Sequence, residues 1–324
     1  MDDRSGRFII YGAGAIGSVF GGMLARSGHQ VSLVGRDPHM EVVRNNGLSM
    51  DGLLGTHHVK GLEACMDLDK INSASPAAAV LISVKSNATA FAVKALSASD
   101  LVGEETLVVS LQNGLGNLEL IREVFGNGRS YGGRVIFGAG IPCPGKVHVS
   151  VWADKVLIGG PESQEGIKAG RDLADLLTDC GIQTQAVEDI QAALWGKVLY
   201  NVGLNPLSAM LGVPYGDLGR QKNSREVLTA LMREAFLVAS KEVELPWRSA
   251  EAYLDHFFSD LLPPTEAHKS SMLQDIIQGR ETEIDAITGQ VIVRAGRHGV
   301  TVPVNRVVYN LVRAMEKGKR VNSE

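Results

Sequence analysis

The 324-residue chain has few cysteines and little net charge. Its three cysteines, Cys65, Cys143 and Cys180, are too scattered for a disulfide framework, and the lack of a Cys-x-x-Cys pair argues against zinc. With 32 basic and 36 acidic residues, the net charge of -4 offers no electrostatic surface for nucleic acid. We therefore expect a folded protein of the reducing cytoplasm that binds neither a metal nor a nucleic acid.

The sequence also lacks a convincing membrane segment. Residues 8–25 form an uncharged run of 18, but five glycines interrupt it and the chain starts with acidic residues where a signal peptide has basic ones. We expect neither a signal peptide nor a membrane partner.

Length and glycine distribution indicate two domains, since domains average ~150 residues. Of the 37 glycines, 27 fall in residues 1–188 and 10 in residues 189–324. The first part alternates short β-branched runs with helical stretches, whereas the pattern after residue 190 is long and helical. We predict a Rossmann-type α/β domain with a parallel sheet over residues 1–188, followed by an all-α domain over residues 189–324. The expected strands are 8–11, 31–34, 79–84, 106–111 and 130–137, with a hairpin in 145–158 and a helix over 166–180.

A glycine loop follows the first expected strand. Gly12-Ala13-Gly14-Ala15-Ile16-Gly17 lies between that strand and a helix expected over residues 18–27, the context in which this spacing indicates a dinucleotide site. Gly12 allows the tight turn, Gly14 allows the backbone to approach a pyrophosphate, and Gly17 allows close packing of helix on strand. The helix N-terminus then faces the anion. The alternative is a glycine-rich turn that serves packing alone.

The residues after the second strand indicate which dinucleotide binds. An NAD site places an acidic residue there for the ribose 2′-hydroxyl, whereas this chain has Arg36, whose guanidinium can pair with a 2′-phosphate. NADP(H) is the predicted cofactor, and Asp37 as a ribose acceptor is the alternative. Lys85, just after a later strand, either adds a second charge to the phosphate or is a solvated surface lysine.

A polar stripe marks the helical part. Lys197, Asn201 and Asn205 are spaced four residues apart, so on a helix they drift by only ~40° per step among apolar neighbours. They form either a catalytic stripe or a structural polar network. Gln112-Asn113-Gly114 directly follows a strand, at the edge where α/β sheets bind ligands, although Asn-Gly is also an ordinary turn. A further cluster comprises residues 268–275 and 282–285.

The order of these motifs along the whole chain resembles the ketopantoate reductase family. That resemblance implies NADPH-dependent reduction of 2-dehydropantoate to (R)-pantoate, for pantothenate and coenzyme A biosynthesis. It implies that Lys197 is the general acid and that Glu283 completes the catalytic pair. A lysine of pKa about 10.4 is a poor acid at neutral pH, so apolar surroundings would improve the match.

The resemblance also assigns the remaining site residues and the partners. The substrate would be held by Asn113, Asn201, Asn205 and Ser271. The cofactor contacts would be Gly12, Ala13, Gly14, Ala15, Ile16, Gly17, Arg36, Lys85, Asn113, Ala139 and Glu283. The partner would be a small 2-oxo acid, and a homodimer stays open.

Two positions depart from the family pattern. Tyr215 and His268 stand where we would expect asparagines that contact substrate, and rings in place of amides change both pocket shape and hydrogen bonding. Two alternatives therefore accompany the leading prediction: a reductase of a different 2-oxo or 3-oxo acid, and a non-catalytic NADPH-binding sensor.

Overall fold

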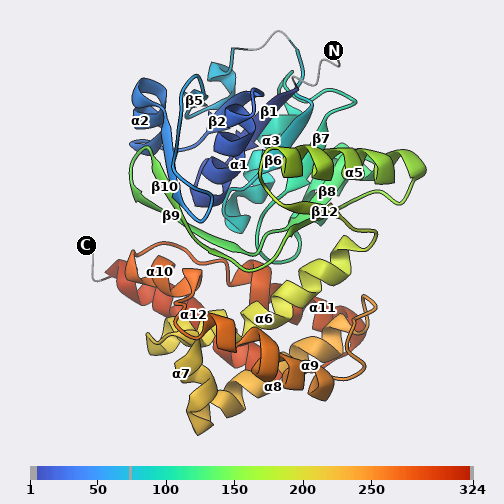
Figure 1. Ribbon diagram of the computed structural model, residues 1–324. Helices are drawn as coiled ribbons and strands as arrows, with labels where there is room; N and C mark the ends of the chain where they lie inside the picture. Colours follow the sequence, from blue (N-terminus) through green and yellow to red (C-terminus); the bar gives the residue numbers. More distant parts are fainter. Residues whose placement is uncertain (1–5, 73–74, 322–324) are drawn as a thin grey trace. The chain divides into compact units, whose positions relative to one another are not determined.

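The computed structural model describes residues 6–72 and 75–321 (Figure 1). The chain divides into two compact units: unit 1 comprises Met1–Gln112 and Asn117–Ile190, and unit 2 comprises Asn113–Gly116 and Gln191–Glu324. Unit 2 therefore contains four residues from the middle of unit 1's sequence.

The centre of unit 1 is an eight-stranded sheet in which neighbouring strands run parallel, except for the antiparallel pair β8 and β11. The predicted parallel sheet is confirmed. In spatial order its strands are β12 (Thr184–Ala186), β11 (Val156–Gly159), β8 (Ser130–Arg134), β7 (Leu107–Ser110), β6 (Ala79–Ile82), β1 (Arg7–Tyr11), β2 (Gln30–Val34) and β5 (Glu63–Cys65).

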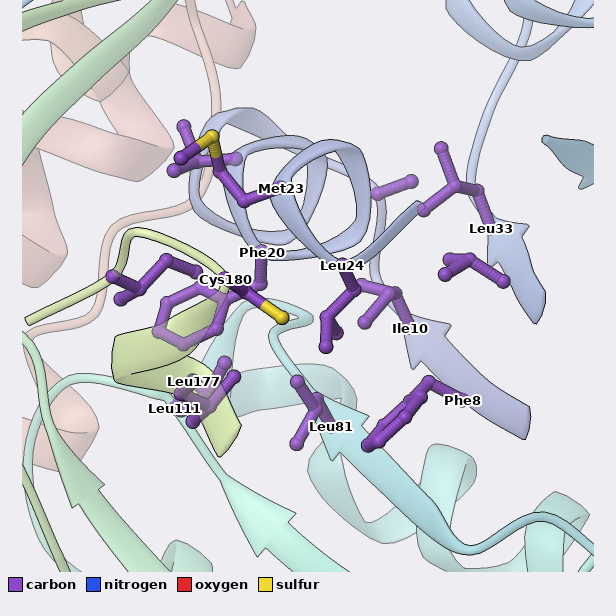
Figure 2. Close-up of a cluster of buried hydrophobic side chains, with 14 of the residues drawn as sticks. Phe8, Ile10, Phe20, Met23, Leu24, Leu33, Leu81, Leu111, Leu177 and Cys180 are labelled. Atoms are coloured by element: carbon purple, nitrogen blue, oxygen red, sulfur yellow. The ribbon is translucent and has the colours of Figure 1, made fainter. Parts of the chain in front are cut away.

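Helices cover both faces of this sheet because its strands are apolar on both sides. Phe8 and Ile10 of β1 pack towards α1 (Ala15–Arg26) and α5 (Gln164–Asp179), whereas Ile9 packs towards α3 (Thr89–Ser97) and α4 (Asn117–Phe125). Figure 2 shows the first of these cores, with side chains of α1 lying over the strands and Leu177 and Cys180 nearby.

A second, four-stranded sheet also belongs to unit 1, and the sequence did not predict it. Its spatial order is β4 (His57–Val59), β3 (Leu48–Gly52), β10 (Lys146–Trp152) and β9 (Phe137–Cys143). Phe137 of β9 stacks on Phe20 of α1, with ring centroids 6.1 Å apart. Helix α2 (His39–Asn46) lies between β2 and β3 in the chain.

Two strand predictions were wrong in this region. The hairpin expected within residues 145–158 does not form, because β10 pairs with β9 and β3 while β11 joins the main sheet. The strand expected over residues 130–137 ends at Arg134, and Phe137 begins β9. Alternating apolar residues indicate strands but not their partners, and the turn at Pro144-Gly145, where Gly145 has φ +77°, is the local signal for the true hairpin.

All the regular secondary structure in the described part of unit 2 is helical, which confirms the all-α prediction. Helix α6 contains Pro206 without ending there. No helix in the described ranges is long and apolar enough to cross a membrane. The helices are α6 (Ile190–Leu211), α7 (Tyr215–Arg220), α8 (Lys222–Ala239), α9 (Ala250–His256), α10 (Ser271–Ile277), α11 (Gln290–His298) and α12 (Pro303–Val321), with π-helical turns η4 (Phe257–Leu261) and η6 (Asp285–Gly289).

Candidate active site

The glycine loop has the geometry that its spacing predicts. Gly12 has φ +110°, and a Cβ there would lie 2.3 Å from the Val84 backbone nitrogen. A Cβ at Gly17 would lie 2.4 Å from the Gly12 carbonyl oxygen, so both positions require glycine. At Gly14 a Cβ would meet nothing closer than 4.0 Å. Gly12 and Gly17 therefore serve the turn and the packing, and the space above Gly14 is open.

The N-terminus of α1 follows this loop directly. Ser18 donates its backbone N–H to the Gly14 carbonyl at 2.8 Å, as the first bond of the helix. The N–H groups of Ala15, Ile16 and Gly17 precede that bond and so have no acceptor within the helix. Ala13 is buried and donates its N–H to the Val34 carbonyl at 2.8 Å. This end of α1 carries the positive end of the helix dipole and can hold a phosphate.

Arg36 and Lys85 follow strands on either side of β1. Tyr11, Val34 and Ile82 lie in register, so the loops after β1, β2 and β6 leave the sheet at one edge. Both Arg36 and Lys85 are exposed on these loops. The edge that carries the glycine loop thus also carries two cations.

Asp37, the alternative ribose acceptor, already has a structural partner. Its Oδ1 accepts the Glu41 backbone N–H at 2.9 Å, near the start of α2. Across residues 6–72 and 75–321, the Arg36 guanidinium has no hydrogen bond or ion pair. At this position Asp37 is thus engaged by α2, whereas the Arg36 side chain is not engaged by any described residue.

Ala139 lies in the second sheet rather than the main one. It pairs with Val149 in the β9–β10 ladder and is half-buried against the core that contains α1.

The predicted stripe lies on one helix. Lys197 and the two asparagines Asn201 and Asn205 all belong to α6. Lys197 Nζ donates to Asn113 Oδ1 at 2.5 Å, and Asn113 Nδ2 donates to Glu283 Oε2 at 3.1 Å. The Asn113 amide therefore joins the two predicted catalytic side chains, which are 86 positions apart in the sequence.

Gly114 fixes the position of that amide. It has φ +84°, and a Cβ on it would lie 2.3 Å from the Ala286 carbonyl oxygen. The next residue, Leu115, donates its N–H to the same oxygen at 2.8 Å. The segment thus lies against the start of η6, close to Glu283 in the chain.

Asn201 and Asn205 differ in their partners. The side chain of Asn201 is only 7% exposed, yet within the described residues its amide makes no hydrogen bond. Asn205 is buried, and its Oδ1 accepts the Tyr215 hydroxyl at 2.7 Å. A buried amide without a partner is costly unless water or a ligand supplies one, so Asn201 is suited to bind a ligand.

Two serines at the start of α10 differ in their burial. Ser271 is exposed at the first position of the helix. Ser270, which the sequence did not single out, is fully buried; its Oγ donates to the Asn205 carbonyl at 3.3 Å and accepts the Leu273 N–H at 3.0 Å. A serine just before a helical stretch is a common N-cap, and this sequence pattern could have identified Ser270.

Glu283 is buried and lies on a segment held by α12. The N–H of its neighbour Thr282 donates to Glu316 Oε1 at 2.7 Å, and the Tyr309 hydroxyl donates to Asp285 Oδ1 at 2.7 Å. Sequence reasoning missed Glu316, because a glutamate in a charged C-terminal stretch is usually solvated.

The two departures from the family pattern lie together beside Asn205. The rings of Tyr215 and His268 are 5.2 Å apart, and the Tyr215 N–H donates to the His268 carbonyl at 3.0 Å. Burial raises the pKa of the Tyr215 hydroxyl and lowers the pKa of the His268 imidazole. Both rings are therefore neutral at pH 7 and act by hydrogen bonding and shape.

Comparison with known proteins gives consistent matches across the chain. Residues 8–162 match the family model of "Ketopantoate reductase PanE/ApbA", and residues 189–316 match that of its C-terminal part. The 2-dehydropantoate 2-reductase of Aquifex aeolicus is 34% identical over 313 residues, covering 96% of this chain and 97% of that protein. The enzyme of the same name from Pyrococcus abyssi is 31% identical, covering 97% and 100%.

Solved structures agree with this assignment. A PanE/ApbA family ketopantoate reductase from Ralstonia eutropha JMP134 has a TM-score of 0.84 at 31% identity, covering 97% of this chain and 99% of that one. A ternary complex of D-mandelate dehydrogenase with NADH and anilino(oxo)acetate has a TM-score of 0.85 at 26% identity, covering 96% and 99%. The chain therefore belongs to the ketopantoate reductase family and is a nicotinamide-dependent oxidoreductase.

Proposed function

We propose that the chain reduces 2-dehydropantoate to (R)-pantoate with NADPH, and that Lys197 donates the proton. The observation that carries this proposal is the hydrogen-bonded series from Lys197 through Asn113 to Glu283. Lys197 and Glu283 are ionisable groups linked through an amide, and Lys197 shares α6 with Asn201, whose amide has no partner within the described residues. Such an arrangement is suited to proton transfer at a bound carbonyl.

The proposed reaction has two components. A bound nicotinamide would supply the hydride for the carbonyl carbon. The Lys197 ammonium donates the proton to the carbonyl oxygen, and the resulting neutral amine regains a proton from solvent. Glu283, as a carboxylate, accepts from Asn113 Nδ2 and so orients the Asn113 oxygen towards Lys197. Asn201, Asn205 and Ser271 would hold the carboxylate and hydroxyl of the substrate.

NADPH is the proposed reductant because Asp37 is engaged by α2 whereas Arg36 is unpaired within the described residues. A guanidinium can form two charge-assisted hydrogen bonds with a 2′-phosphate. The loop of residues 12–17 would hold the pyrophosphate, with Lys85 near the phosphates and Ala139 and Asn113 near the nicotinamide. Under this proposal the enzyme supplies pantoate for pantothenate and coenzyme A.

The test is turnover by the purified chain, followed as NADPH absorbance with 2-dehydropantoate. Lys197→Ala should lower kcat by at least ~100-fold, the usual contribution of a general acid. Lys222→Ala, which removes an exposed lysine of α8, is the matched control and should leave kcat unchanged. No turnover by the wild-type chain refutes the substrate, and near-normal turnover by Lys197→Ala refutes the acid.

A second candidate is a reductase of a different 2-oxo or 3-oxo acid, favoured by the two rings beside Asn205. The similarity to a D-mandelate dehydrogenase makes an aryl 2-oxo acid the natural comparison. If benzoylformate gives a higher kcat/KM than 2-dehydropantoate, this candidate replaces the first. Membership of a reductase family favours an enzyme over the NADPH-binding sensor, and a homodimer and a cytoplasmic location stay predictions.

A further inference from the structure

The Tyr215 hydroxyl has one hydrogen-bond partner within the described residues, Asn205 Oδ1 at 2.7 Å. Tyr215 is only 4% exposed. A buried hydroxyl needs an acceptor for its proton, and the carbonyl oxygen of an amide is an acceptor whereas its NH₂ group is not. The contact therefore sets which end of the Asn205 amide faces the tyrosine.

Because Oδ1 faces the Tyr215 hydroxyl and the two ends of a planar amide point in different directions, Asn205 turns its Nδ2 group away from the tyrosine. Across residues 6–72 and 75–321 this group has no hydrogen-bond partner, and the residue is 4% exposed. The unsatisfied amide of Asn201 lies one turn earlier on the same face of α6. On the stripe that begins with Lys197, Asn205 therefore directs its N–H donor away from Tyr215 and keeps its oxygen towards the tyrosine.

The tyrosine itself is held in place by several contacts. Its N–H donates to the His268 carbonyl at 3.0 Å, the His268 ring lies 5.2 Å from its ring, and the Tyr200 ring lies 6.0 Å away. Burial keeps its hydroxyl protonated by raising its pKa. Its hydroxyl is thus a fixed donor rather than an adaptable one.

We propose that Tyr215 is a positioning residue that fixes the polarity of the Asn205 amide, so that Asn205 accepts only substrates placing a hydrogen-bond-accepting oxygen beside it. This inference rests on the proposed function. It deepens that function by specifying the substrates: oxo acids that place an oxygen beside Asn205 Nδ2 should bind. Analogues that place an ammonium or amide N–H beside Nδ2 should be rejected, because two hydrogen-bond donors would then face each other.

The test is a double-mutant cycle, using whichever 2-oxo acid the wild-type chain reduces. Tyr215→Phe keeps the ring and frees the amide to rotate, and should raise KM for the oxo acid about five- to tenfold while kcat changes less than about twofold. In an Asn205→Ala background, Tyr215→Phe should change KM by less than about twofold, because its target is gone. Equal effects in both backgrounds, or no rise in KM, overturn the proposal.

Tyr200→Phe is the matched control. It removes a half-buried hydroxyl of the same aromatic cluster, one that bonds Thr265 Oγ1 at 2.6 Å and not Asn205. It should leave KM within about twofold of wild type, whereas a rise equal to that of Tyr215→Phe would indicate general loosening of the cluster and refute the specific role.

A ligand-free measurement separates this inference from the proposed function. In the ¹⁵N spectrum of the unliganded protein, the Asn205 Nδ2H₂ pair is identified by its loss in Asn205→Ala. It should shift in Tyr215→Phe and stay in place in Tyr200→Phe. If no oxo acid is reduced the proposed function fails, but an unshifted Nδ2H₂ pair in Tyr215→Phe is what refutes the positioning role.

Discussion

Gly114→Ala tests whether the backbone at residue 114 holds the Asn113 amide in place. Gly114 has φ +84°, a conformation that costs an L-residue ~1–2 kcal/mol. The new Cβ would lie 2.3 Å from the Ala286 carbonyl oxygen, so the segment has to move away from it. That movement adds overpacking of ~1–3 kcal/mol and the loss of the Leu115 to Ala286 hydrogen bond, worth ~1 kcal/mol.

The expected loss in the free energy of unfolding is therefore ~3–6 kcal/mol, measured by urea denaturation. Gly212→Ala is the control, because Gly212 has φ +72° with no atom within 4 Å of the new Cβ and should lose only ~1–2 kcal/mol. Movement of the segment also separates Asn113 from Glu283, so kcat should fall for Gly114→Ala alone. Equal destabilisation by the two substitutions would refute the steric argument.

Three further predictions concern the cofactor, α12 and acid sensitivity. Arg36→Ala should raise KM for NADPH about 10- to 100-fold and leave KM for NADH nearly unchanged, which steady-state kinetics with both cofactors will show. Glu316→Ala leaves the buried Thr282 N–H without its acceptor and should lower unfolding free energy by ~1–3 kcal/mol in urea, whereas Glu316→Gln retains an acceptor and should lose less. Burial lowers the pKa of His39, so the unfolded chain binds a proton there more readily than the folded chain. The free energy of unfolding should therefore fall below pH ~6.5, by up to ~1.4 kcal/mol per pH unit. Urea denaturation at a series of pH values should find this slope reduced in His39→Asn.

Local sequence signals predicted the elements of unit 1 that depend on neighbouring residues. The strands of residues 7–11 and 30–34 and the helix between them follow from apolar runs and the glycine spacing. The second sheet could not be predicted in this way, because β3 and β10 pair across almost a hundred residues of chain. Pairing at that separation depends on which surfaces meet in the folded core. The boundary expected at residues 188 and 189 stays a prediction.

The candidate site shows the same limit. The four-residue spacing placed Lys197, Asn201 and Asn205 on one helix face, since helical periodicity is a local property. Their partners come from distant segments: Asn113 for Lys197, and Tyr215 for Asn205. The family resemblance named Asn113 and Glu283 as site residues. The hydrogen bond between them and the role of Glu316 required the structure.

Residues 113–116 limit how this protein can be divided. They follow directly on Gln112, the last residue of unit 1's first stretch, but pack as part of unit 2. A fragment consisting of residues 191–324 would lack the Asn113 amide and the Leu115 bond to Ala286. A chimera that exchanges residues 1–190 for those of a relative would import that relative's version of this segment. An exchange of all of unit 1 therefore also changes the partner of the proposed acid, whereas a crossover between Lys85 and Asn113 would carry over the glycine loop and Arg36 and leave that partner in place.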